Sequence, residues 1–128
     1  MEEKIVSLSV PAETGYARSV RMLAANLAVV SGLGIDDVED VRMAAEEGFV
    51  YSCATGPDRC DISFTLGQGE VAIDFGLGDA KDEQVEAAGF DISMAELLLS
   101  AVCDDFVITD EDTLHLVKKA SELGGADA

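Results

Sequence analysis

The sequence predicts an α+β fold: a two-layer sandwich in which helices pack on one face of a mixed, mostly antiparallel sheet. Alternating apolar residues mark one strand at the start of the chain and two strand pairs, within 60–78 and 105–120. Apolar residues at helical spacing mark two long helices between the first strand and the first pair. This order lacks the repeated strand–helix alternation of a doubly wound parallel sheet and fits a layered α+β domain instead.

The first strand and helix follow from the opening 34 residues. Residues 4–11 alternate Ser7 and Ser9 with Leu8 and Val10, and Pro11 closes the run, which is typical of a strand. A helix is predicted from about residue 13 until the sequence "SGLG" ends it. Its apolar residues recur at helical spacing at Val20, Leu23, Leu27 and Val30.

A second helix is predicted within residues 35–57. Asp36 or Asp37 suits its N-cap, acids fill the first turn, and Gly56 followed by Pro57 stops it. One stripe of the helix is apolar or small: Val38, Val41, Ala45, Phe49 and Ser52. We expect this stripe to face the core.

The remainder predicts two hairpins with helices between them. The first hairpin, within 60–78, has a turn at residues 67–69, which include two glycines. Its inward residues would be Ile62, Phe64 and Leu66 on one arm and Val71, Ile73 and Phe75 on the other. Residues 76–91 predict a glycine-bearing acidic loop with a short helix near "DEQVEAAG", and residues 92–104 predict an apolar helix. The second hairpin turns across "DEDT".

The length and composition predict one domain over residues 1–120 and a disordered tail over residues 121–128. The 128-residue chain has no apolar stretch long enough to cross a bilayer and no signal-peptide layout at its start, so a soluble cytoplasmic protein is expected. A formal net charge of −18 disfavours nucleic acid and anionic membranes as partners. It favours a protein partner with a basic face.

The cysteines and the histidine are not arranged as a metal or catalytic site. Cys53, Cys60 and Cys103 are odd in number and lack C-x-x-C spacing, which disfavours a disulfide framework and a zinc site. We expect buried free thiols. His115 lies in an alternating pattern and is interpreted as a strand side chain.

Two polar residues of the second helix lie apart from its core stripe. With an advance of 100° per residue, Glu47 falls opposite Val38, and Tyr51, four residues later, shares the face of Glu47. They are therefore predicted to point away from the core contact as a neighbouring pair. Such pairs are usually ordinary solvated side chains.

The order of motifs around this pair resembles a known family. A strand ends in Val10-Pro11-Ala12, a long helix follows, and an acid-rich cap precedes a second helix that carries Glu47. This arrangement resembles the anti-sigma-factor serine kinases of the GHKL ATPase superfamily, whose histidine kinase-like ATPase domain has the Bergerat fold. The resemblance continues to "TLHLVKKA" near the C-terminus and covers most of the chain.

The resemblance implies a role for Glu47 and a departure at Tyr51. In such kinases the corresponding Glu is the general base toward a serine hydroxyl of a protein antagonist, and an Asn four positions later holds the Mg²⁺ that bridges the ATP phosphates. Tyr51 occupies the position of that Asn. A phenol is a poor ligand for Mg²⁺, which demands octahedral oxygen geometry. The substitution therefore predicts a weakened or lost metal site.

The nucleotide-site motifs leave two interpretations open. "DFGLG" matches the family's Asp-x-Gly-x-Gly box, in which Asp74 would accept from the adenine amino group and Gly76 and Gly78 would let the backbone approach the nucleotide. Alternatively, Asp74 is the outward residue of a strand, and the glycines form the turn that follows. The family's later glycine-rich box falls on the helix start, where Ser93 and Ala95 replace its glycines.

These features predict an anti-sigma-factor-like regulatory protein that binds a sigma factor, a serine-bearing anti-anti-sigma protein, or both. ATP and Mg²⁺ are implied only if the family's site still functions, in which case the alternative is an active serine kinase. The resemblance also implies a homodimer with the first strand and helix near the partner surface. Arg18 and Arg21 are either contacts to an acidic partner segment or ordinary solvated arginines.

Overall fold

The computed structural model describes residues 3–110 and 112–121 and confirms the predicted α+β fold. In the described residues, the strands are β1 (Lys4–Pro11), β2 (Arg59–Gly67), β3 (Glu70–Gly76), β4 (Asp105–Thr109) and β5 (Thr113–Lys119). The helices are the 3₁₀ turn η1 (Thr14–Tyr16) and the α-helices α1 (Ala17–Val30), α2 (Ile35–Ala54), α3 (Asp82–Ala87) and α4 (Ile92–Val102). None of these helices combines the length and apolar character needed to cross a membrane.

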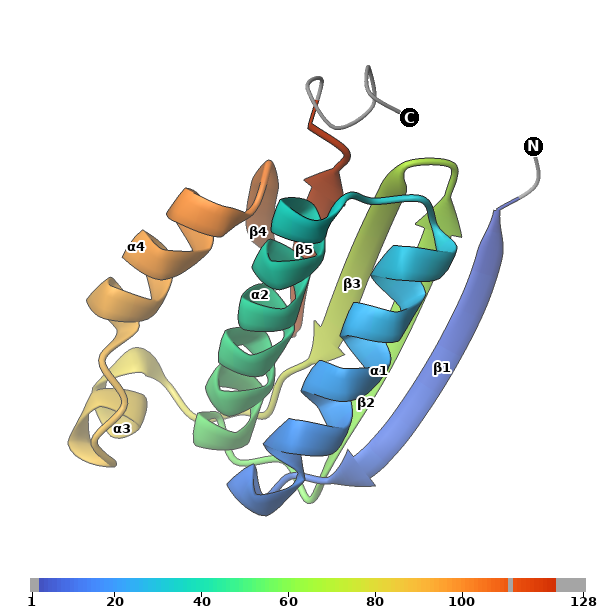
Figure 1. The fold of residues 1–128 in the computed structure, drawn as a ribbon. Coiled ribbons are helices and arrows are strands. Elements are labelled where there is room, and N and C mark those ends of the chain that lie inside the picture. The colour runs from blue at the N-terminus through green and yellow to red at the C-terminus, as the bar shows by residue number, and fades with distance from the viewer. Residues whose placement is uncertain (1–2, 111, 122–128) are drawn as a thin grey trace.

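The sheet order among the described strands is β1-β2-β3-β5-β4, and every neighbouring pair is antiparallel. Figure 1 shows α1, α2 and α4 together on one face of this sheet. The other face carries no helix, so the strands alternate inward apolar and outward polar residues. Phe49 of α2, Phe64 of β2 and Phe75 of β3 are fully buried between the two layers.

The inward residues of the first hairpin are confirmed. Its turn contains Gln68 and Gly69 between the paired residues Gly67 and Glu70, and Gly69 has a φ of 72°. The core stripe of α1 differs from the prediction at one end. Val30 is 69% exposed because α1 ends there, and Ala24 and Ala28 complete the buried stripe beside Val20 and Leu27.

The N-cap of α2 is Gly34, so the prediction of Asp36 or Asp37 was wrong. The helix begins at Ile35, and both aspartates lie in its first turn. Asp37 is 5% exposed, because its carboxylate is used for contacts across the molecule instead of for capping. It accepts a hydrogen bond of 2.7 Å from the backbone N–H of Ser121, the first residue of the predicted tail. The rest of that tail lies outside the described residues.

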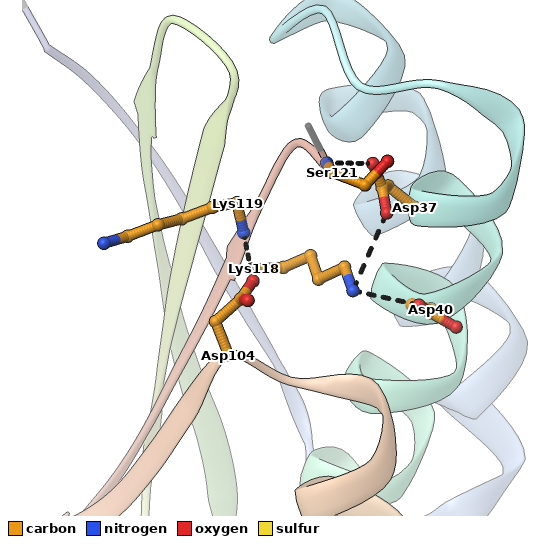
Figure 2. A network of polar contacts seen from close by, with 6 residues as sticks. All are labelled: Asp37, Asp40, Asp104, Lys118, Lys119 and Ser121. Atoms are coloured by element: carbon orange, nitrogen blue, oxygen red, sulfur yellow. Dashed lines mark hydrogen bonds and ion pairs between the residues drawn. The ribbon is translucent and has the colours of Figure 1, made fainter. Parts of the chain in front are cut away.

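A lysine of β5 joins this acidic turn to the sheet (Figure 2). Lys118 Nζ lies 2.9 Å from Asp40 Oδ2 and 3.7 Å from Asp37 Oδ1. Burial alone would lower the pKa of Lys118. The hydrogen bond to Asp40 and the charges of Asp40, Asp104 and Asp37 outweigh that effect, so the pKa is raised. The charged lysine therefore ties the end of β5 to the start of α2.

Candidate functional site

The position of α2 over the sheet depends on a glycine between the two residues predicted to carry chemistry. A Cβ atom at Gly48 would lie 2.5 Å from Cε1 of Phe75, which is closer than two carbon atoms can approach. Gly48 thus lets α2 pack directly on the phenyl ring of β3. Tyr51, three residues after Gly48, lies on the flank of this contact, and Glu47, the residue before Gly48, lies farther around the helix from it.

Tyr51 is buried, contrary to the prediction that it points away from the core. Its exposed fraction is 6%, and its ring meets the ring of Phe90 edge to face, with centroids 5.3 Å apart and planes at 67°. Phe90 lies between α3 and α4 in the chain, and α4 packs beside α2. Helical spacing indicates only which side of α2 packs on its main core contact. It cannot indicate that Phe90 would also bury the ring of Tyr51.

Glu47 is half-buried, one turn before Tyr51. Its pKa is raised, first by burial and second by the neighbouring charge of Glu46. Glu47 makes no hydrogen bond or ion pair with another described residue. It carries a carboxylate of increased basicity, but it does not line the cleft described next.

A cleft of about 800 Å³ opens beside the C-terminal half of α2. Its lining includes Tyr51 and Thr55 of α2, residues 77–83, and part of the β4–β5 hairpin. The charged residues among its described lining are one lysine, Lys81, and five acids: Asp79, Asp82, Glu83, Asp110 and Asp112. Residues 76–91 are recognisably acidic in the sequence, but no local pattern indicates that they and the turn at 110–112 line one cleft.

The wall of the cleft between β3 and α3 is fixed to α2 by hydrogen bonds. Ser52 Oγ donates to the carbonyl of Gly76 at 2.6 Å, and the N–H of Gly78 donates to Thr55 Oγ1 at 2.7 Å. The N–H of Ala80 donates to the carbonyl of Thr55 at 3.1 Å. A Cβ at Gly78 would lie 2.3 Å from that carbonyl oxygen. Gly78 is therefore explained by close packing on the protein's own backbone.

Asp74 lies on the open face of the sheet, as the second of the two interpretations predicted. Phe75 points into the core, so Asp74 points the other way because side chains alternate along a strand. Its carboxylate oxygen Oδ1 lies 2.5 Å from Nδ1 of His115, its partner on β5. Asp74 lines a separate hollow of about 560 Å³, and the structure does not bring it together with Tyr51.

The start of α4 already has anionic partners. Asp91 is the N-cap, and its carboxylate accepts from the N–H of Met94 at 2.9 Å. A carboxylate oxygen of Glu86 accepts from the N–H of Ile92 at 2.8 Å. Of the two positions predicted to replace glycines, Ser93 is exposed and Ala95 is 1% exposed. Carboxylates thus already accept hydrogen bonds from backbone N–H groups that would otherwise attract a phosphate.

The two arginines of α1 differ in their surroundings. Nη1 of Arg21 lies 2.8 Å from Oε1 of Glu46, so this arginine joins α1 to α2. Arg18 is exposed one turn earlier and makes no hydrogen bond or ion pair with another described residue. Arg18 is the arginine of the pair that remains available to a partner.

The thiols do not form a reactive site. Cys53, Cys60 and Cys103 are free, and burial is the main cause that raises the pKa of each, to about 11 for Cys53 and about 12 for Cys103. They are therefore protonated, weak nucleophiles at neutral pH. Among residues 3–110 and 112–121, no three acidic, histidine or cysteine side chains are grouped closely enough to hold a metal ion.

Comparison with models of known protein families finds no match, and a search among curated proteins finds none either. The resemblance to anti-sigma-factor serine kinases therefore stays a prediction from the order and spacing of the motifs.

Proposed function

We propose that this protein is an anti-sigma-factor-like regulator that acts by binding proteins and not by transferring phosphate. Its partners would be a sigma factor, a serine-bearing anti-anti-sigma protein, or both. The observation that carries the proposal is Tyr51, a buried phenol packed on Phe90 at the position where the resembling kinases need a magnesium-binding Asn. A phenol held in this way offers a hard divalent ion one neutral oxygen.

The charge and geometry around Tyr51 support the loss of ATP chemistry. Five described carboxylates line the cleft, and a triphosphate placed there would be repelled. Asp74, to which the resemblance assigns adenine binding, is paired with His115 on the open side of the sheet and does not line the cleft that Tyr51 lines. Gly78 is explained by its close packing on the backbone carbonyl of Thr55 in the turn after α2, without a nucleotide.

Calorimetry tests the nucleotide part of the proposal. We expect no saturable heat when ATP or ADP is titrated to millimolar concentration, with or without Mg²⁺, because the metal ligand is missing and the cleft is acidic. The Tyr51→Asn variant is the informative companion, since it restores the missing amide. We expect this variant to give no saturable heat either, because Asp74 and the start of α4 differ from a nucleotide site as well. Saturable heat in the wild-type protein that depends on Mg²⁺ would overturn this part of the proposal.

The exposed side of α1 supports the protein-binding part. Met22 and Val29 lie seven residues apart on one side of the helix and are 58% and 61% exposed, and Arg18 lies one turn before Met22. Ile5, on the edge strand β1, is 67% exposed, but it points to the open face of the sheet, like its partner Thr65 on β2, and so does not belong to this side of α1. Exposed apolar groups next to a positive charge suit a protein contact. We propose that the exposed side of α1, together with the edge of the sheet at β1, serves the regulatory partner and the homodimer.

Co-purification with candidate sigma factors and anti-anti-sigma proteins tests the partner surface. We expect a complex that forms equally well with and without ATP, and we expect Met22→Glu to weaken it about tenfold by placing an unpaired charge in the contact. Met94→Glu is the matched control, because Met94 is 59% exposed on α4, away from this surface. Recovery of only free protein with every candidate, or an equal loss in both variants, would count against the proposal.

One observation favours the alternative function, an active serine kinase. Glu47 is half-buried and its pKa is raised, which suits a general base. If labelled phosphate passed from ATP to a serine of an anti-anti-sigma protein, and Glu47→Gln abolished the transfer, the kinase would replace the binding module as the proposed function.

A further inference from the structure

The carboxylates of the acidic cleft are spread along its lining. Its five described carboxylates come from two places in the sequence: Asp79, Asp82 and Glu83 from the segment before and within α3, and Asp110 and Asp112 from the β4–β5 turn. They are too dispersed to form a group that would hold a metal ion. A ligand with several separated positive charges fits this distribution better than a single ion.

Tyr51 provides an independent sign that the cleft receives a ligand. The residue is 6% exposed and lines the cleft, and its hydroxyl makes no hydrogen bond with any described residue. The ring is buried, whereas the hydroxyl is not one of the described buried polar atoms that lack a partner, so it opens toward the cleft. Burial raises its pKa, and the charges of Asp82 and Glu96 raise it further, so the phenol stays neutral. The phenol oxygen can therefore accept a hydrogen bond from an incoming N–H group.

We propose that the cleft beside α2 binds arginine or lysine side chains of an extended segment of a partner protein. The carboxylates would attract the segment and neutralise its charges, and Tyr51 would accept a hydrogen bond from one guanidinium or ammonium group. This site is separate from the surface of β1 and α1. The inference rests on the proposed function only in taking the natural ligand to be a protein.

A short basic peptide tests the cleft directly. The probe is acetyl-Arg-Ala-Arg-Ala-Arg-amide, titrated by calorimetry into the full chain at low ionic strength, and acetyl-Glu-Ala-Glu-Ala-Glu-amide is the peptide control. We expect saturable binding of the basic peptide alone. Binding should weaken as salt is added, because the attraction is electrostatic. No saturable binding of the basic peptide would overturn the proposal.

Two matched charge variants separate the cleft from the general negative charge of the protein. Asp79→Asn with Asp110→Asn removes two charges inside the cleft, and Glu3→Gln with Asp58→Asn removes two exposed charges outside it. We expect the cleft variant to bind the peptide about tenfold more weakly and the distal variant less than about twofold more weakly. An equal loss in both variants would mean that net charge alone holds the peptide, and the proposal would be wrong.

Tyr51→Phe supplies the most specific readout. It removes only a hydroxyl that has no hydrogen-bond partner among the described residues, so the melting temperature should not fall. We expect peptide affinity to decrease about threefold, as for one lost hydrogen bond. Unchanged affinity would overturn the role of Tyr51. Failure of these peptide tests would leave nucleotide-independent complexes with candidate regulators unaffected, so it can be told apart from failure of the proposed function.

Discussion

Replacing Lys118 with methionine is expected to lower the free energy of unfolding by about 3 kcal/mol, because two carboxylates then lose their cation. The side chain of Lys118 is 16% exposed and that of Asp37 is 6% exposed, so water cannot fully replace the lost ion pair. Methionine keeps most of the apolar stem of lysine, so the change reports mainly on the charge. Urea unfolding at pH 7, with a reductant to keep the three thiols free, measures the effect.

The neighbouring residue provides a matched control. Lys119 lies on the same strand, but Figure 2 shows its side chain pointing away from α2, and only its backbone N–H is bonded, to Asp104 at 2.6 Å. Lys119→Met should change the unfolding free energy by less than about 0.5 kcal/mol. Adding Asp37→Asn and Asp40→Asn to Lys118→Met should recover about half of the loss, because no charge is then left unpaired. Equal effects of the two lysine variants would refute the importance of this ion pair.

The same cluster predicts a dependence on alkaline pH. The pKa of Lys118 is raised in the folded protein, so its contribution to stability is fully present below the ordinary lysine pKa of about 10.4. The contribution is lost as the pH rises through the raised folded value. The stability difference between the wild-type protein and Lys118→Met should therefore stay constant from pH 7 to about pH 10 and shrink above it. A difference that grew with rising pH would contradict this assignment.

Replacing Gly48 with valine is expected to destabilise the protein by about 3 kcal/mol, at the upper end of the usual cost of overpacking. The first added carbon would already lie 2.5 Å from the ring of Phe75, and that ring is fully buried and cannot move into solvent. The helix must then move away from the sheet, which would also open the core around Phe49. Thermal and urea unfolding measure the loss.

A glycine in open space is the control for this substitution. A Cβ at Gly15 would meet no atom within 4 Å, so Gly15→Val should have little effect. Adding Phe75→Leu to Gly48→Val should restore part of the lost stability, because the smaller side chain makes room for the new methyl groups. If Gly48→Val were as stable as the wild-type protein, the direct contact between α2 and β3 would not be what requires a glycine there.

Local sequence patterns were sufficient to predict the secondary structure and the fold class. The period of two in β2 and β3 identified which residues face the core, because a strand with one buried face must alternate. Of the stripe predicted for α2, the residues from Val41 to Ser52 are buried, but Val38 is only half-buried, and Gly48, outside the stripe, makes the close contact with the sheet. Glycines identified where α1 ended and the first hairpin turned. These features depend on residues close together in the chain.

The candidate site depends on contacts between distant parts of the chain, which local sequence patterns do not encode. Helical spacing placed Tyr51 opposite the sheet, but it could not indicate that Phe90 would cover the ring. It offered two interpretations of Asp74, and only the pairing with His115 on β5 chose between them. Asp37 fitted a capping role until Lys118 and Ser121, about 80 residues away, proved to be its partners.

The sequence by itself therefore determined the order of helices and strands, the two-layer fold and the inward residues of the sheet. It also determined the large negative charge. Only the tertiary structure decided that the acids of 79–83 and 110–112 surround one cleft with Tyr51 in its wall. The physical reason is that hydrophobic periodicity encodes which side of an element is buried, whereas which distant side chains meet is fixed by how the elements pack.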